Sequence, residues 1–178
     1  AYTEYGVNIT RASGYSSSGP YEVPNVNTDS YCIYTNHPVG GAMRGFGMPE
    51  MHAGLEQCID ELALKIGLDA VEFRKLNCLK TGSTLVTGSK MHATGLTSCI
   101  EKTAEAIGWG KKAPASAPNK RRGKGLALMW KAPAMPPNAG SSAWVELAED
   151  GTVNVGVGGQ EIGQGVFTVA AQMAAGAL

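Results

Sequence analysis

Residues 157–172 read VGGQEIGQGVFTVAAQ, a glycine-rich loop with a single carboxylate, Glu161, ahead of an apolar run. The preceding segment, SAWVELAEDGTVNVGV (142–157), alternates apolar and polar residues on both sides of Asp150-Gly151. That dipeptide accepts the positive φ angles of a tight turn. The sequence therefore predicts a β-hairpin whose second strand runs into the loop, with a helix after the loop.

A strand, a glycine-rich loop and a helix start present backbone N–H groups and the positive end of a helix dipole, which favour an anion such as pyrophosphate. The spacing is not that of a P-loop. It fits the dinucleotide fingerprint only if Gly158, Gln160 and Gly163 are forced into it. On these residues alone, a plain structural turn is an equal alternative. Glu161 is a candidate base because it lies among polar residues of this loop.

A second glycine-rich loop, GGAMRGFGMPE (40–50), surrounds Arg44 and Phe46 with glycines just before a predicted helix. A guanidinium held there can pair with an oxyanion or a metal-bound oxygen, and the phenylalanine ring offers a flat apolar face. The alternative is that Arg44 caps a local turn and Phe46 fills the core.

Helices are predicted after this loop. Pro49 suits the first turn of a helix that ends at Gly67. Asp69 and Glu72 have capping-box spacing for a short helix to about Asn77, and a third helix is expected from about Leu96 to Ile107. The first helix carries one apolar stripe, formed by Met51, Leu55, Ile59, Leu62 and Ile66.

The chain is expected to form a mixed α/β (α+β) fold in two parts. Residues 111–122 are rich in proline, small residues and positive charge, and we read them as a linker. Residues 1–110 then form a helix-rich part, in which 21–34 is extended. Residues 123–178 form a strand-rich part that begins with a strand in GLALMW (125–130).

Composition limits the function classes. Fifteen basic and fifteen acidic residues cancel, so no nucleic-acid or membrane partner is expected. The basic run 120–124 reads as a solvated linker rather than a polyanion site, because no aromatic residue is interleaved with its charges. The four cysteines are widely spaced and form no metal motif, which favours free thiols and a cytoplasmic protein. Both ends of the chain read as cut, so we expect a piece of a larger protein.

The two loops together resemble a known family. AMRGFGMPE (42–50) resembles the FRGFG-x-P-Q loop of the molybdenum-binding subunit in the xanthine dehydrogenase and aldehyde oxidase family. GGQEIGQG (158–165) resembles that family's second pterin-contacting loop, GGTEMGQG, and the intervening residues 54–77 are also similar. The resemblance runs from about Tyr21 to the end. It implies an internal fragment that spans the end of one molybdopterin-binding domain and the start of the next.

The resemblance implies roles for individual residues. Arg44 would lie near the oxygen ligands of molybdenum, and Phe46 would stack on an aromatic substrate. The metal would be held through the pterin, with no protein ligand from this chain. The residues expected to contact the cofactor are Met43, Arg44 and Gly45 in the first loop and Gln160, Ile162, Gly163, Gln164 and Gly165 in the second.

The implied activity is molybdopterin-dependent hydroxylation of a small-molecule substrate, with water as the oxygen source. The cofactor would be molybdopterin, in bacteria often as its cytosine dinucleotide. The 2Fe-2S clusters and FAD would belong to other domains or subunits, which agrees with the lack of clustered cysteines in this chain. In this family the catalytic glutamate comes from a segment beyond Leu178, so Glu161 is expected to be scaffold, and the chain alone is not expected to turn over.

Departures from the family bear on the substrate. Purine-oxidising members carry an arginine where this chain has Ala12, with Arg11 one place away, and a phenylalanine near the position of Pro133. We therefore expect another heteroaromatic substrate or an aldehyde rather than xanthine, or an aryl thioester as in the aryl-coenzyme A reductase branch. Two other classes stay open: a non-catalytic anion-binding module, and an assembly domain that docks through the helix from Pro49 to Ile66.

Overall fold

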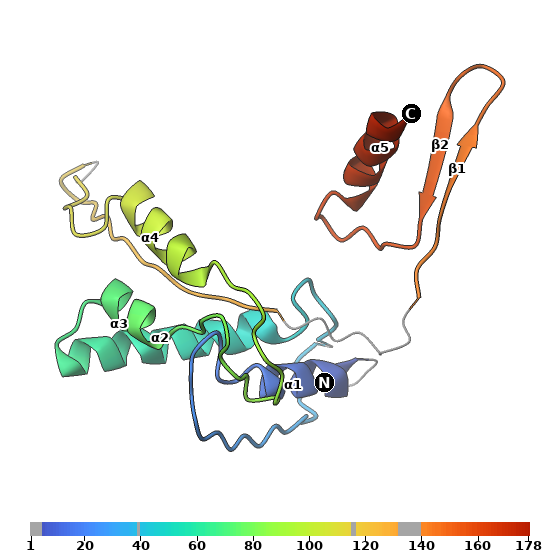
Figure 1. Ribbon diagram of the computed structural model, residues 1–178. Coiled ribbons are helices and arrows are strands. Elements are labelled where there is room, and N and C mark those ends of the chain that lie inside the picture. The colour runs from blue at the N-terminus through green and yellow to red at the C-terminus, as the bar shows by residue number, and fades with distance from the viewer. Residues whose placement is uncertain (1–4, 39, 115–116, 132–139) are drawn as a thin grey trace. The chain divides into compact units, whose positions relative to one another are not determined.

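The computed structural model describes residues 5–38, 40–114, 117–131 and 140–178. The chain divides into two compact units, Ala1–Ala132 and Pro133–Leu178 (Figure 1). The first unit is helical, and the second holds a two-stranded sheet and a helix. The mixed helix and strand content predicted from the sequence is confirmed. No helix in the described ranges is both long and apolar enough to cross a bilayer.

The helices of the first unit are α1 (Gly6–Tyr15), α2 (Met48–Ile66), α3 (Ala70–Asn77) and α4 (Leu96–Ala106). The predicted end of α2 is confirmed: the helix ends at Ile66, and Gly67 follows it in the left-handed conformation with φ +73°. Asp69 caps α3 by accepting hydrogen bonds from the amides of Val71 and Glu72 at 2.8 and 3.2 Å. In the order of contacts, α1 packs on α2, α2 on α3, and α3 on α4.

The core of the first unit lies against the inner faces of α2, α3 and α4. On α2 the predicted stripe is only half right: Leu55 and Ile59 pack on the core, whereas Leu62 and Ile66 are 45% and 53% exposed. The buried core residues are Tyr21, Val71, Cys78, Ile100, Ala104, Leu126 and Leu128.

A polar network also lies on the buried face of α2. His52 and Glu56 of α2 are buried, and the Glu56 carboxylate pairs with the fully buried guanidinium of Arg74 from α3 at 2.8 Å. The same carboxylate accepts hydrogen bonds from the Tyr21 hydroxyl at 2.5 Å and the Leu128 amide at 2.9 Å. Glu56 therefore ties together four segments that are distant in sequence. Burial and this contact raise the pKa of the Tyr21 hydroxyl.

Two segments predicted to be extended make no ladder in the described part of the chain. In residues 21–34 only Tyr21 forms a bridge, to Cys78. Residues 125–130, predicted as a strand, pair with no described strand, and instead bury Leu126 and Leu128 in the core of the first unit. A strand forms hydrogen bonds with a neighbouring strand, and the residue pattern of these two segments does not show whether such a neighbour exists. The domain boundary at 111–122 stays a prediction.

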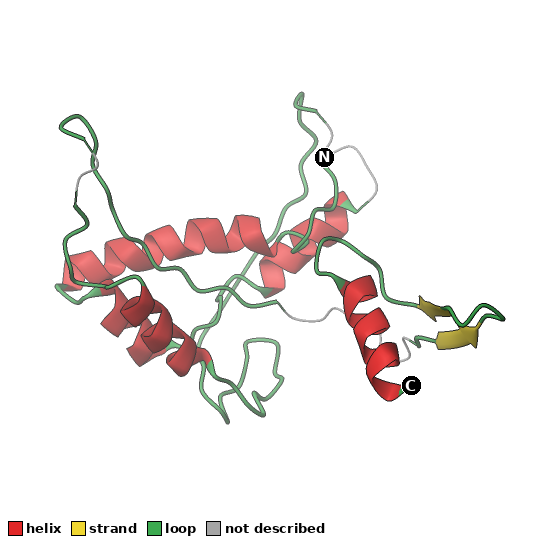
Figure 2. Cartoon of the chain, turned by 90° about the horizontal axis from the view of Figure 1, so that it is seen from above, coloured by secondary structure: helices red, strands yellow, loops and turns green. Residues whose placement is uncertain are grey.

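The second unit contains β1 (Ala143–Leu147), β2 (Val153–Val157) and α5 (Val166–Ala177) (Figure 2). The predicted hairpin is confirmed: the strands are antiparallel, and the turn between them has Gly151 at φ +83°. Trp144 faces Gly156 across the hairpin, and its indole lies where a β-carbon at Gly156 would stand. α5 contacts β2, so the intervening loop is held at both ends.

Candidate functional site

The first loop has an unusual backbone. Gly45, Phe46 and Gly47 are consecutive residues with φ of +101°, +56° and +88°. A left-handed conformation at a phenylalanine costs free energy, and such residues persist where neighbouring contacts hold them. The amide of Phe46 donates to the carbonyl of Met43 at 2.7 Å, which closes the turn around Arg44.

This loop is fixed against α1. The Ser13 hydroxyl donates to the Gly47 carbonyl at 2.8 Å. A β-carbon at Gly47 would stand 2.5 Å from the carbonyl oxygen of Ile9, so only glycine allows this approach. The Phe46 ring meets Tyr5 edge to face, with the ring centroids 6.0 Å apart. The loop is therefore a rigid turn rather than a loose connection.

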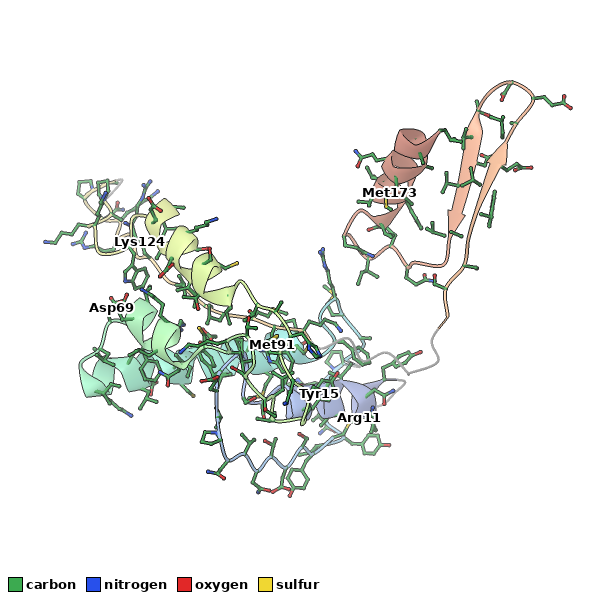
Figure 3. All side chains as sticks on the ribbon, viewed as in Figure 1. Arg11, Tyr15, Asp69, Met91, Lys124 and Met173 are labelled. Atoms are coloured by element: carbon green, nitrogen blue, oxygen red, sulfur yellow. The ribbon has the colours of Figure 1, made fainter. Side chains whose placement is uncertain are left out.

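The side chains predicted for function lie on the outside of this turn. Met43 is 75% exposed and Arg44 is exposed, whereas Phe46 is half-buried. Ala12, one of the two departures expected to bear on the substrate, is buried in α1, and Arg11 beside it is exposed (Figure 3). Pro133, the other departure, lies outside the described residues.

The second loop is organised by its own carboxylate. Glu161 Oε1 accepts hydrogen bonds from the amides of Gly163 at 2.6 Å and Gly165 at 3.1 Å, at the N-terminus of α5. The amides of Gly165 and Gly163, with those of Val166 and Phe167, hold the pKa of the Glu161 carboxyl below its ordinary value. A general base needs a pKa near the working pH, so this environment opposes a catalytic role for Glu161.

The glutamines complete the second loop. Gln164 Oε1 accepts a hydrogen bond from the Ile162 amide at 2.7 Å, and its Nε2 donates to the Gln160 carbonyl at 2.5 Å. Gln160, Glu161, Ile162 and Gln164 are all exposed. The loop thus offers an exposed row of polar groups, held in place by hydrogen bonds within it.

The structure brings the predicted residues together within each loop, Met43–Phe46 in the first unit and Gln160–Gly165 in the second. Among the described residues, no group of histidine, cysteine, aspartate and glutamate side chains could hold a metal ion. The four cysteines are free thiols. In the first unit, the exposed guanidinium of Arg44 can donate hydrogen bonds to an oxyanion.

The sequence did not predict two clusters of charged and aromatic side chains of the kind found in functional sites. One is the buried Glu56 and Arg74 pair, which the spacing of apolar residues hides because both lie on helix faces that read as polar. The other is a basic pocket at the end of α4, where Trp109 lies among four cationic side chains. Trp109, Lys111 and Lys112 are neighbours in sequence, but Arg122 and Lys124 come from a later segment, so the sequence alone does not bring the four cations together.

Two different models of a molybdopterin cofactor-binding domain match the chain, one over residues 1–78 and the other over residues 102–178. A putative xanthine dehydrogenase molybdenum-binding subunit, XdhA, of Escherichia coli (strain K12) is 35% identical over 98% of this chain and 24% of its own length. The nicotinate dehydrogenase large molybdopterin subunit of Eubacterium barkeri is 38% identical over 59% of this chain and 25% of its own length.

Among solved structures, the aldehyde oxidoreductase from Desulfovibrio desulfuricans superposes with a TM-score of 0.60 at 26% identity, over 87% of this chain and 17% of that one. The chain thus spans about a quarter of the length of the two curated relatives named above, and as little as 12% of the length of others. Two matching domains, each containing one of the two glycine-rich loops, carry the assignment. The chain belongs to the molybdopterin cofactor-binding domain family, among the relatives of xanthine dehydrogenase molybdenum-binding subunits and aldehyde oxidoreductases.

Proposed function

We propose that this chain supplies two cofactor-contacting loops of a molybdenum hydroxylase, an oxidoreductase that oxidises a small molecule with water as the oxygen source. The observation that carries the proposal is the pair of loops: each lies within its own match to the molybdopterin cofactor-binding family, and each is a fixed turn with exposed polar groups. A single glycine-rich loop would not support it.

The second loop offers the cofactor a fixed backbone. The amides of Gly163 and Gly165 are held by the Glu161 carboxylate, so the remaining polar groups of the loop would meet the cofactor. We assign Gln160, Ile162, Gly163, Gln164 and Gly165 to the pterin and its phosphate. The exposed side-chain amide of Gln164 uses one donor and one acceptor within the loop, which leaves its second N–H and a second lone pair on its oxygen for a pterin ring edge.

The first loop fits the reacting end of the cofactor. Arg44 presents a guanidinium that can donate two parallel hydrogen bonds to oxygen atoms, and the backbone of Met43 and Gly45 flanks it. The molybdenum centre, when bound, supplies the redox chemistry. Phe46, whose backbone amide donates to the Met43 carbonyl, would orient a flat substrate by stacking.

The substrate we favour is a heteroaromatic compound other than xanthine, or an aldehyde. Ala12 is buried and has no charged group with which to grip a purine. The relatives named nicotinate dehydrogenase and aldehyde oxidoreductase support these two substrate classes. An electron-poor aromatic ring also suits the half-exposed ring of Phe46.

The partners we propose are iron–sulfur and FAD domains or subunits, which would take the electrons from the molybdenum centre. Relatives are named as molybdenum-binding subunits, which implies further subunits. The four free thiols suit a reducing compartment, so we place the enzyme in the cytoplasm.

The test uses the full-length enzyme and a panel of purines, N-heteroaromatic acids and aldehydes. We expect turnover of a heteroaromatic acid or an aldehyde, with xanthine among the slowest substrates. Arg44→Ala should lower kcat by about a hundredfold or more with the cofactor retained, because a charged donor at a reacting oxygen is lost. Arg121→Ala, which removes an exposed arginine whose guanidinium donates to the backbone carbonyls of Pro118 and Lys120, should change kcat less than about twofold. Near-normal turnover of Arg44→Ala would contradict the assignment.

A further inference from the structure

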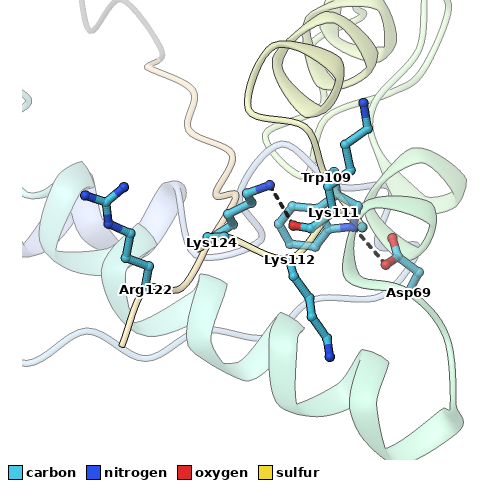
Figure 4. Close-up of a pocket in the computed structure, with 8 residues that line it drawn as sticks. Asp69, Trp109, Lys111, Lys112, Arg122 and Lys124 are labelled. Carbon is cyan, nitrogen blue, oxygen red and sulfur yellow. Dashed lines mark hydrogen bonds between the residues drawn. The ribbon is translucent and has the colours of Figure 1, made fainter. Parts of the chain in front are cut away.

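A basic pocket at the C-terminal end of α4 is unexplained by the cofactor loops. It has a volume of about 460 Å³ and is lined by Asp69, Trp109, Gly110, Lys111, Lys112, Ala113, Arg122 and Lys124 (Figure 4). Such a volume is within the range of small-ligand pockets. Four basic residues and one acidic residue give the lining a formal charge of +3.

The single acidic residue does not neutralise these cations. Asp69 accepts hydrogen bonds through Oδ1 from the backbone of α3 and through Oδ2 from the Trp109 indole at 2.9 Å. In the described part of the chain, Lys111, Lys112, Arg122 and Lys124 form no ion pair. The surplus of positive charge in the lining is self-repulsive, and an anionic ligand relieves that repulsion.

One cation and one ring are held in fixed positions. Lys124 donates from Nζ to the carbonyls of Gly108 at 2.5 Å and Lys111 at 2.8 Å. An ammonium has three N–H groups, so one is left to face a ligand. The Trp109 indole packs on the core, and Asp69 holds its N–H (Figure 4). The pocket thus combines a fixed charge with a fixed aromatic surface.

The fold builds this pair from separate segments. Gly108 and Gly110 have φ of +62° and +77°, and they turn the chain sharply after α4 so that Trp109 lies between them. Arg122 and Lys124 arrive from the basic segment that, in sequence, lacks an aromatic neighbour. The sequence favoured a solvated linker because no aromatic residue is interleaved with these charges. In the folded chain, however, Trp109 lines the same pocket as Arg122 and Lys124.

We propose that this pocket binds a small ligand of the nucleoside diphosphate class. Its phosphoryl oxygens would contact Lys112, Arg122 and Lys124, and its base would stack on Trp109. Guanidinium and ammonium groups are the usual partners of phosphate, and an indole is the best stacking surface among side chains. Lys111 also borders a neighbouring hollow that contains Glu101 and Glu105, so it contributes less to an anion site.

The test measures binding to the full-length protein by titration calorimetry, with inorganic pyrophosphate, adenosine and ADP as probes. We expect pyrophosphate to bind, ADP to bind more tightly, and both affinities to fall as salt is raised. Lys112→Gln/Arg122→Gln should weaken pyrophosphate binding by about tenfold or more. The control Lys120→Gln/Arg121→Gln removes the same charges from the same segment but outside the pocket lining, and should change binding by less than about twofold.

Three results would overturn the proposal. Equal weakening by both double variants would mean a general charge effect and no site. If ADP bound no more tightly than pyrophosphate, or if Trp109→Leu left the affinity for ADP unchanged, the base would not stack on Trp109. Saturable binding of an acidic peptide without binding of pyrophosphate would assign the pocket to a protein partner. None of these results depends on the molybdenum activity, so they test the pocket independently of the proposed function.

Discussion

The Glu161 carboxylate accepts a hydrogen bond from the Gly165 amide at 3.1 Å, four residues along the chain and at the start of α5. With the bond from Gly163, it occupies the position at which a helix N-terminus attracts an anion. The sole carboxylate of this loop therefore organises backbone amides. This role differs from that of a base, and the difference can be measured.

Glu161→Gln should leave the full-length enzyme active, with kcat within about tenfold of wild type. The glutamine carbonyl can still accept from the same amides, although more weakly without the charge. Removal of a true general base costs about 10²–10⁴-fold. Steady-state kinetics of Glu161→Gln beside Glu149→Gln, an exposed glutamate near the hairpin turn, checks this. A thousandfold loss confined to Glu161→Gln would restore Glu161 as the base.

The same carboxylate should give this unit an acid-sensitive stability. Because the folded pKa of Glu161 is lowered, chiefly by the Gly165 amide, its contribution is fully present above the unfolded pKa of about 4.3. That contribution is lost as pH falls through the lower folded pKa. Hydrogen exchange at the α5 amides should thus differ between wild type and Glu161→Gln at pH 6, and the difference should shrink in strong acid. A difference that grows on acidification would contradict the sign.

Arg74→Met should destabilise the first unit by about 3–5 kcal/mol, because it leaves the Glu56 carboxylate buried without its cation. Glu56→Gln added to Arg74→Met should recover part of the loss, since the glutamine oxygen can still accept from the Leu128 amide and its NH2 group can donate to the Tyr21 hydroxyl oxygen. Amide hydrogen exchange of α2 and α3 in the full-length protein measures both effects. A loss below about 1 kcal/mol for Arg74→Met would mean that the pair is dispensable.

Gly47→Ala should loosen the first loop from α1 at a cost of about 2 kcal/mol or more. The residue has φ +88°, and its new methyl group would meet the Ile9 carbonyl oxygen at 2.5 Å. The matched control is Gly54→Ala, an exposed position in α2 with no atom within 4 Å of the new methyl group. That change should stabilise α2 by about 0.5–1 kcal/mol. Equal effects of the two substitutions on exchange of the α1 amides would refute the close packing at Gly47.

The sequence predicted those features that depend on local chemistry. The end of α2 at Gly67, the capping of α3 by Asp69, and the hairpin around Gly151 each follow from a residue type and a backbone requirement, and each is confirmed. Features that depend on contacts between distant segments could not be predicted. The buried face of α2 contains Glu56 because Arg74 lies opposite, and this pairing has no signature in apolar periodicity.

In the candidate site, too, the sequence predicted some features and not others. Glycine content and loop order predicted where the two loops lie, and the two domain matches agree with the family resemblance. The positive φ at Phe46 and the folding of Glu161 onto its own helix were not predicted, because both depend on the final backbone. The roles assigned to Arg44, Phe46 and Gln164 remain proposals.

The central claim, that both loops hold a pterin, is tested most directly by the molybdenum and pterin content of the purified full-length protein. We expect about one molybdenum and one pterin per chain in the wild type. Gln164→Ala should lower both together, whereas Gln172→Ala, an exposed glutamine of α5, should not. A folded wild-type protein that carries neither molybdenum nor pterin, or Gln164→Ala protein with full content of both, would contradict the account.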